Sequence, residues 1–134
     1  MRLRVEMLQT ILYVEDQERS RAFYELLFRR PADLHVPGMT EFRLTDSCKL
    51  GLMPNKGIAK ILEGRTPHPG EGNGIPRCEL YLVVADAGAE YDHALRCGGK
   101  PISPVSARDW GDLVGYLSDP DGHIIALAQR LSGA

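Results

Sequence analysis

Apolar and polar residues follow the same order twice along the chain. Residues 9–16 alternate as a β-strand with one buried face does, and residues 17–30 carry apolar side chains at helical spacing. The predicted buried face of this helix holds Ala22, Phe23, Leu26 and Leu27. Asp16 stands directly before the helix, where its side chain can cap the first backbone N–H groups. This stretch therefore predicts a strand followed by a helix.

The same order returns in the second half of the chain. Residues 79–86 are rich in β-forming residues, and a helical pattern follows them. The apolar positions of this pattern are Ala87, Tyr91, Ala94 and Leu95. Asp86 is the predicted N-cap, and Gly98 with Gly99 is predicted to end the helix. A repeated supersecondary unit of this kind indicates a duplicated fold.

Shorter strand-like segments follow each helix. They cover residues 40–44 and 49–53 in the first half, and 101–105, 112–117 and 123–128 in the second. Asp119 to Gly122 form a turn signal between the last two. A lone βαβββ module exposes too much apolar surface, so two must cooperate. The sequence predicts an α+β fold, a single domain over 1–134, with modules at 7–53 and 78–132 and a Gly- and Pro-rich connecting loop at 54–77 that carries a short helical pattern at 58–62.

Composition narrows the class of protein. The 134 residues are 43% hydrophobic and 25% charged, which is typical of a compact domain with a real core. The net charge is -2 and no basic face is evident, so we expect no nucleic-acid partner. No apolar stretch reaches the length of a signal peptide or membrane span, so we expect a cytoplasmic protein without a membrane partner. Three cysteines without CxxC spacing indicate reduced core thiols.

Three segments resemble the vicinal oxygen chelate superfamily, which includes glyoxalase I, bleomycin-resistance proteins and extradiol dioxygenases. They are LQTILYVEDQERSRAFYELLF, its echo CELYLVVADAGAEYDHALRCGGK, and the closing WGDLVGYLSDPDGHIIALAQ. The resemblance spans nearly the whole chain, and the last segment is the most specific. It implies curved mixed sheets that enclose a cleft between the two modules, and we expect a homodimer.

The resemblance also implies four positions for ligands of a divalent metal. In this sequence they fall on Gln9, Gly51, Glu79 and Ala126. Gly51 and Ala126 have no donor side chain, Gln9 offers a neutral amide, and only Glu79 is a good ligand. We therefore predict no metal and no other cofactor, and we expect the space at Gly51 and Ala126 either to admit a ligand or to be filled by a side chain such as Met53.

Glu79 is the candidate catalytic residue, because strand alternation places it on one face with Tyr81. It would act as a general base or accept hydrogen bonds from a ligand, and the alternative is an edge carboxylate paired with Arg77. The resemblance implies an apolar wall over the cleft. The further candidates for ligand contact are Phe42, Met53, Arg108, Trp110 and Tyr116. For the three aromatic residues the alternative is plain core packing, and for Arg108, which would meet an anionic group, the alternative is a solvated loop charge. None of the four histidines has metal or catalytic spacing.

Three functions remain open at this point. The first is a metal-free protein that binds a small organic molecule. The second is a metal-dependent glyoxalase-like lyase, isomerase or dioxygenase that uses non-standard ligands. The third is an interaction module without a small-molecule role, since fold alone does not decide function.

Overall fold

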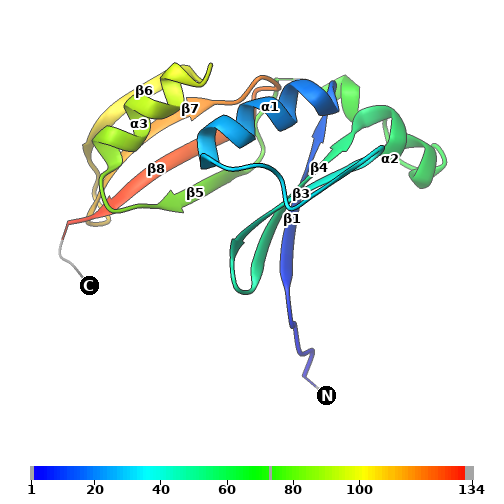
Figure 1. Ribbon diagram of the computed structural model, residues 1–134, viewed down its shortest axis with the longest axis horizontal. Helices are drawn as coiled ribbons and strands as arrows, with labels where there is room; N and C mark the ends of the chain where they lie inside the picture. Colours follow the sequence, from blue (N-terminus) through cyan, green and yellow to red (C-terminus); the bar gives the residue numbers. More distant parts are fainter. Residues whose placement is uncertain (1, 73, 132–134) are drawn as a thin grey trace. The chain divides into compact units, whose positions relative to one another are not determined.

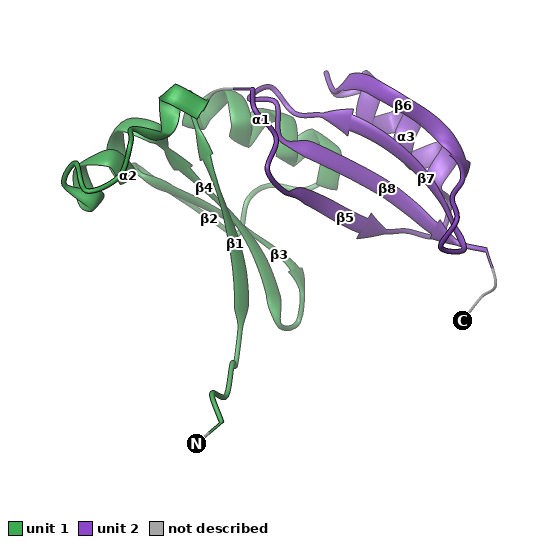
Figure 2. Cartoon of the chain, turned by 180° about the vertical axis from the view of Figure 1, so that it is seen from behind, with its two compact units in different colours: residues 1–73 green, residues 74–134 purple. Residues whose placement is uncertain are grey.

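The computed structural model describes residues 2–72 and 74–131 and divides the chain into two compact units, residues 1–73 and 74–134 (Figure 1, Figure 2). Unit 1 contains β1 (Leu8–Val14), α1 (Gln17–Phe28), β2 (Leu34–Val36), β3 (Met39–Thr45), β4 (Cys48–Pro54), α2 (Asn55–Leu62) and the 3-10 helix η1 (Pro69–Gly72). Unit 2 contains β5 (Glu79–Val83), α3 (Ala87–Arg96), β6 (Lys100–Ala107), β7 (Asp112–Ser118) and β8 (Ile124–Arg130). None of the described helices combines the length and hydropathy that crossing a membrane requires.

Each unit contains one four-stranded mixed sheet. The strand orders are β1-β4-β3-β2 and β5-β8-β7-β6, and in both sheets the first strand is parallel to the last while the other pairs are antiparallel. The predicted α+β fold of two βαβββ modules is confirmed. The segment expected to be a connecting loop, 54–77, holds α2 and η1, so the helix there starts before the predicted residue 58. Ser132, the last residue of the predicted second module, lies outside the described residues.

Helix α1 packs on one face of the unit 1 sheet. Its buried residues are Ser20, Phe23, Tyr24 and Leu27. Ala22 is exposed and Leu26 is 58% exposed, so the predicted buried face was wrong for both. Positions 20, 23, 24 and 27 follow the i, i+3, i+4, i+7 spacing, which buries the two aromatic rings together and turns Leu26 outward.

Phe42 belongs to this core. Its side chain is 0% exposed, and its ring centroid lies 5.3 Å from Phe28 and 6.4 Å from Tyr24. Side chains alternate across a strand, so Phe42 points to α1 and Glu41 points to the opposite face. The prediction that Phe42 lines a ligand site was therefore wrong, because the residue is a core side chain.

Helix α3 covers one face of the unit 2 sheet through the predicted residues Ala87, Tyr91 and Ala94, whereas Leu95 of the predicted face is only partly buried. Gly115 of β7 admits the Tyr91 ring, since a Cβ there would lie 2.6 Å from Tyr91 Cδ1. This close approach explains why the middle of a buried strand carries a glycine.

The predicted helix caps are present. Asp16 accepts a hydrogen bond from the Arg19 amide, and Asp86 accepts one from the Ala89 amide, both at 3.0 Å. Gly98 has a φ of 107° just beyond α3 and so allows the chain to leave the helix. The three cysteines are free, and Cys78 is exposed, so it is not the core thiol that the sequence suggested.

Candidate functional site

Each sheet has one face packed against a helix, α1 in unit 1 and α3 in unit 2, and one face turned away from that helix. We call the face turned away from the helix the front face. In unit 1, strand register pairs Gln9 with Lys49 and pairs Gly51 with both Ile11 and Glu41. Paired residues of neighbouring strands project to the same side. These five residues therefore share the front face of unit 1, and the structure brings the predicted pair Gln9 and Gly51 together there.

A polar cluster occupies this face. Gln9 Nε2 donates a hydrogen bond to Glu41 Oε2 at 2.9 Å, and Lys49 Nζ lies 3.4 Å from Glu41 Oε1. A Cβ added at Gly51 would lie 2.8 Å from Gln9 Nε2 and 3.2 Å from Ile11 Cγ1. The space above Gly51 is thus filled by Gln9 and Ile11, and also by Met39, rather than by Met53 or a ligand.

This arrangement does not fit a divalent cation at the positions that the resemblance implies. The Gln9 amide presents its N–H group to Glu41, and the Lys49 ammonium neutralises that carboxylate. A metal there would meet the positive charge of Lys49 at close range and would have to displace the donors that both oxygens of Glu41 already accept. In unit 2, Ala126 is 0% exposed and has no donor atom.

On the front face of unit 2, two tyrosines pack on a group of buried apolar residues. Val114, Ala126 and Ala128 are 0% exposed, and the half-buried Tyr81 and Tyr116 pack against them. Tyr81 and Tyr116 are both register partners of Ala126. Ala126, a predicted ligand contact, is therefore covered by aromatic side chains.

Tyr81 connects a buried carboxylate to an exposed indole. Its hydroxyl donates to Asp112 Oδ2 at 2.5 Å and accepts from Trp110 Nε1 at 2.8 Å. Asp112 is 2% exposed and also lies 3.4 Å from Arg130 Nη1, whereas Trp110 is 58% exposed. Burial raises the pKa of the Tyr81 phenol, and the adjacent Asp112 carboxylate raises it further. The phenol therefore stays protonated at neutral pH and keeps its donor role.

Arg108 is held within its own hairpin. Its guanidinium donates to Val114 O at 2.9 Å, to Ser103 Oγ at 3.1 Å and to Pro104 O at 3.1 Å. Its Cζ also lies 5.2 Å from the centroid of the Tyr116 ring, a cation–π distance. The predicted role of Arg108 as a contact for an anionic ligand is not favoured, because its guanidinium donates to groups of β6 and β7 instead.

Glu79 lies on the front face two residues before Tyr81 and is exposed. Within the described residues no side chain, Arg77 included, forms an ion pair or side-chain hydrogen bond with it. Its carboxylate is exposed on the strand face that carries Tyr81, so it supplies negative charge to this face of unit 2. A tight metal site is not formed around it.

In the described part of the chain, one cluster of side chains could ligate a metal ion. It consists of Asp119, Asp121 and His123, whose potential ligand atoms lie within 4.8 Å of one another. Asp119 Oδ1 accepts the Asp121 and His123 amides at 2.9 and 2.8 Å, and Oδ2 contacts His123 Nδ1 at 2.8 Å. Both carboxylate oxygens thus stabilise the predicted turn, and this cluster is a structural feature of the β7–β8 hairpin.

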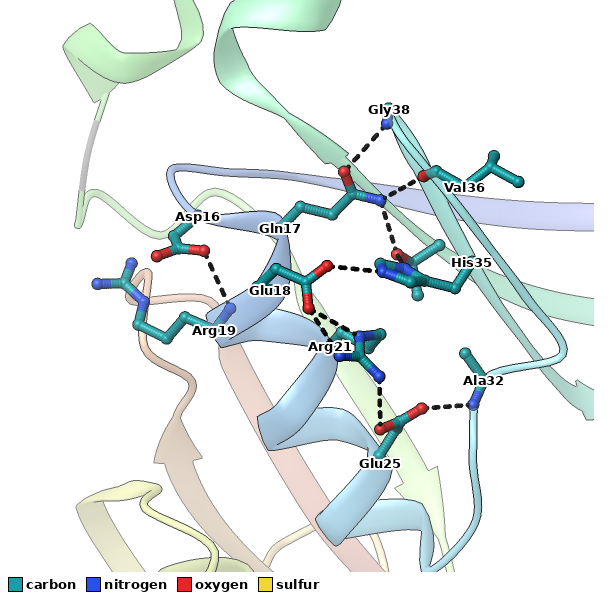
Figure 3. Close-up of polar contacts among 11 residues, drawn as sticks. Asp16, Gln17, Glu18, Arg19, Arg21, Glu25, Ala32, His35, Val36 and Gly38 are labelled. Carbon is teal, nitrogen blue, oxygen red and sulfur yellow. Dashed lines mark hydrogen bonds and ion pairs between the residues drawn. The ribbon is translucent and has the colours of Figure 1, made fainter.

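A second polar network joins the start of α1 to the β2–β3 hairpin (Figure 3). His35 Nε2 lies 2.7 Å from Glu18 Oε1, and His35 Nδ1 lies 2.7 Å from Thr40 Oγ1. Gln17 accepts the Gly38 amide at 3.0 Å. The order carboxylate, imidazole, hydroxyl is that of a nucleophilic triad, but Thr40 is 0% exposed and cannot reach a substrate. The network stabilises the hairpin.

The sequence analysis missed three residues of these faces, Glu41, Lys49 and Asp112. A signal for Glu41 existed, because the alternation in residues 39–45 places it opposite Phe42. Asp112 follows the glycine before a strand and carried no comparable signal, since its partner Tyr81 is 31 residues away.

The chain was compared with protein families and with known proteins. Residues 6–127 match the Glyoxalase/Bleomycin resistance protein/Dioxygenase superfamily. The chain belongs to this superfamily. Uncharacterized proteins of Mycobacterium bovis and Mycobacterium tuberculosis are each 27% identical over 121 residues, which cover 88% of this chain and 79% and 71% of the respective relatives.

Solved structures agree with the fold. A glyoxalase-related enzyme from Fulvimarina pelagi superimposes with a TM-score of 0.77 at 21% identity, over 91% of this chain and 86% of that one. A glyoxalase/bleomycin resistance protein/dioxygenase from Nocardioides gives a TM-score of 0.75 at 19% identity, over 100% and 87%. At such identities the likeness establishes the βαβββ architecture of this superfamily member and no reaction.

Proposed function

We propose that this protein binds a small organic molecule, without a metal, on the front face of unit 2. The observation that carries the proposal is the exposed indole of Trp110, fixed by a hydrogen bond to Tyr81, which is itself anchored on the buried Asp112. An exposed aromatic side chain held in one orientation offers apolar contact area at little entropic cost.

The surrounding charges favour a cationic or neutral aromatic ligand over an anion. Glu79 presents an exposed carboxylate beside Tyr81, while the guanidinium of Arg108 is engaged with the backbone of its hairpin. A cation over the Trp110 ring would gain a cation–π contact as well as attraction to Glu79. Metal coordination is absent from the proposal because Gly51 and Ala126 offer no donor and Lys49 neutralises Glu41.

The binding test uses Trp110, the one tryptophan of the chain, as its own reporter. N-methylpyridinium, phenol and benzoate are titrated with EDTA present while indole emission is recorded. We expect saturable quenching by N-methylpyridinium, weaker binding of phenol and none of benzoate. Glu79→Gln should weaken N-methylpyridinium binding by up to about fivefold. Glu6→Gln, which neutralises an exposed glutamate of unit 1, is the matched control and should leave the affinity measured by calorimetry unchanged. Equal affinities for all three probes, or none, would contradict the proposal.

Metal content separates this function from a metal-dependent lyase, isomerase or dioxygenase. Protein incubated with zinc, nickel, manganese and iron salts and then dialysed exhaustively should retain only substoichiometric metal by elemental analysis. Retention of about one ion per chain would favour the enzyme and would require ligands beyond Glu79.

We also propose a homodimer. Ile11 and Tyr13 on the front face of unit 1 are 37% and 40% exposed, and Val83 of unit 2 is 48% exposed. A second copy would cover such apolar side chains. Light scattering coupled to size-exclusion chromatography should give twice the mass of one chain, and a monomer at all concentrations would exclude this.

A further inference from the structure

Residues 2–7 lead into β1 and project from the sheet of unit 1, and we call this segment the arm (Figure 1, Figure 2). Within the described residues, no hydrogen bond or ion pair involves an arm residue. The first backbone contact of this stretch is made by the Leu8 amide, which donates to Ser47 O at 3.0 Å. Both edges of the arm backbone are therefore open to a further strand.

Apolar and charged side chains alternate along the arm. Leu3 and Val5 are 84% and 68% exposed, and Met7 falls on the same side of an extended chain. Arg4 and Glu6 are both exposed and fall on the other side. Such alternation is typical of a strand with one covered face, but Leu3 and Val5 are left largely uncovered within the single chain.

A second copy of the arm is complementary to the first in an antiparallel pair centred on Val5. Each Leu3 then lies opposite Met7 of the other copy, on the face where the two Val5 side chains meet. On the opposite face each Arg4 lies opposite Glu6 of the other copy, so the arrangement contains two equivalent ion pairs. Apolar side chains thus cover apolar ones, and charges of opposite sign meet.

Other registers lack this complementarity. A register moved by one residue places Val5 opposite a charged residue, either Arg4 or Glu6. A register moved by two residues places Arg4 opposite Arg4 or Glu6 opposite Glu6, and a parallel pair in register does both. Like charges directly opposite each other destabilise a strand pair. The alternation therefore favours the antiparallel register centred on Val5.

We propose that two copies of this chain associate through their arms, which form a two-stranded antiparallel pair centred on Val5. This inference rests on the homodimer proposed above and specifies the segment that forms it. The chain bends at Glu6, and pairing straightens this bend, which no hydrogen bond or ion pair among the described residues holds. The apolar side of the straightened arm then continues into Ile11 and Tyr13, so pairing extends the exposed apolar row of the front face across two unit 1 sheets.

Charge reversal within the arm tests the register, and sedimentation equilibrium of the full chain measures the dimer dissociation constant. Arg4→Glu sets carboxylates opposite each other and Glu6→Arg sets guanidinium groups opposite each other, so each should raise this constant about tenfold or more. The double variant Arg4→Glu/Glu6→Arg restores opposite charges and should dimerise as the wild type does. Lys60→Glu, the same change of charge at an exposed position of α2, is the matched control and should leave the constant unchanged.

Mixing the two single variants separates arm pairing from a general effect of charge. The arm with Arg4→Glu carries carboxylates at positions 4 and 6, and the arm with Glu6→Arg carries guanidinium groups there, so the mixed pair regains both ion pairs. We expect mixed dimers to form with about the wild-type affinity, while each variant alone dimerises weakly.

Two results would overturn arm pairing and leave the homodimer itself standing. In the first, the wild type is a dimer and both single variants dimerise as tightly. In the second, the double variant dimerises no better than the single variants. A wild type that is monomeric at every concentration refutes both the arm pair and the homodimer.

Discussion

Replacing Tyr81 by Phe removes one hydroxyl from unit 2 and nothing else. The buried Asp112 carboxylate then loses its 2.5 Å donor and keeps the Arg130 guanidinium at 3.4 Å. Hydrogen bonds to charged groups contribute about 1.5–3 kcal/mol. The bond from Trp110 adds little, because water can replace it at an indole that is 58% exposed. We expect Tyr81→Phe to lower the free energy of unfolding by about 2 kcal/mol.

Urea denaturation measures this loss, with Trp110 emission and far-UV circular dichroism as two probes. For an m-value of about 1–2 kcal/mol/M the midpoint falls by about 1–2 M. Tyr13→Phe, at a tyrosine that is 40% exposed in unit 1, is the matched control and should change the free energy by less than about 0.5 kcal/mol. If Tyr81→Phe behaves like this control, the Asp112 contact does not hold the aromatic pair in place.

Three other perturbations follow from the structure. Phe42→Ala should cost about 3–5 kcal/mol in urea denaturation while the folded fraction keeps its affinity for N-methylpyridinium, because Phe42 is a core residue. Gly115→Ala should cost about 1–3 kcal/mol in the same assay, since its Cβ would lie 2.6 Å from the Tyr91 ring, and a neutral effect would contradict that packing. Burial lowers the pKa of His123, but the hydrogen bond and charge of Asp119 raise it by more, so the folded value exceeds the ordinary 6.5. Its contribution to stability is therefore complete below about pH 6.5 and is lost as the pH rises through the folded pKa, and thermal melts from about pH 5 to about pH 9 should fall more steeply for the wild type than for His123→Gln.

The duplicated strand and helix pattern was sufficient to predict the two modules, their N-caps and the β7–β8 turn. Strand β2 was missed, because three exposed residues between a loop and Pro37 carry no alternation. The helical segment after β4 was only partly predicted. Its Gly-rich composition favours a loop, and packing of the buried Ile58 outweighs that preference.

Strand alternation alone does not decide which side of a sheet packs on the helix. In β3 it puts Phe42 and Glu41 on different sides, but it does not show which of these two residues points toward α1. Phe42 was therefore assigned to the ligand-binding side, although it points to α1. In unit 2 alternation placed Tyr81 on one face with Glu79, and the resemblance placed Trp110 and Tyr116 with Phe42 on an apolar wall. The structure brings Tyr81 into contact with Trp110 and packs Tyr81 and Tyr116 on the same buried residues, whereas Phe42 is buried in unit 1. Their anchor, Asp112, depends on register between β5, β8 and β7, which the sequence alone does not encode locally.

Every strand pairing that the structure describes lies inside one unit, and the parallel partner of β1 is β4, which ends at Pro54. All strands of the first sheet are therefore synthesised before β5. Domains that are complete in this sense can fold during translation, in the order of their synthesis. The duplication thus allows a growing chain to protect its first set of strand edges and its first aromatic cluster while the second half is still being made.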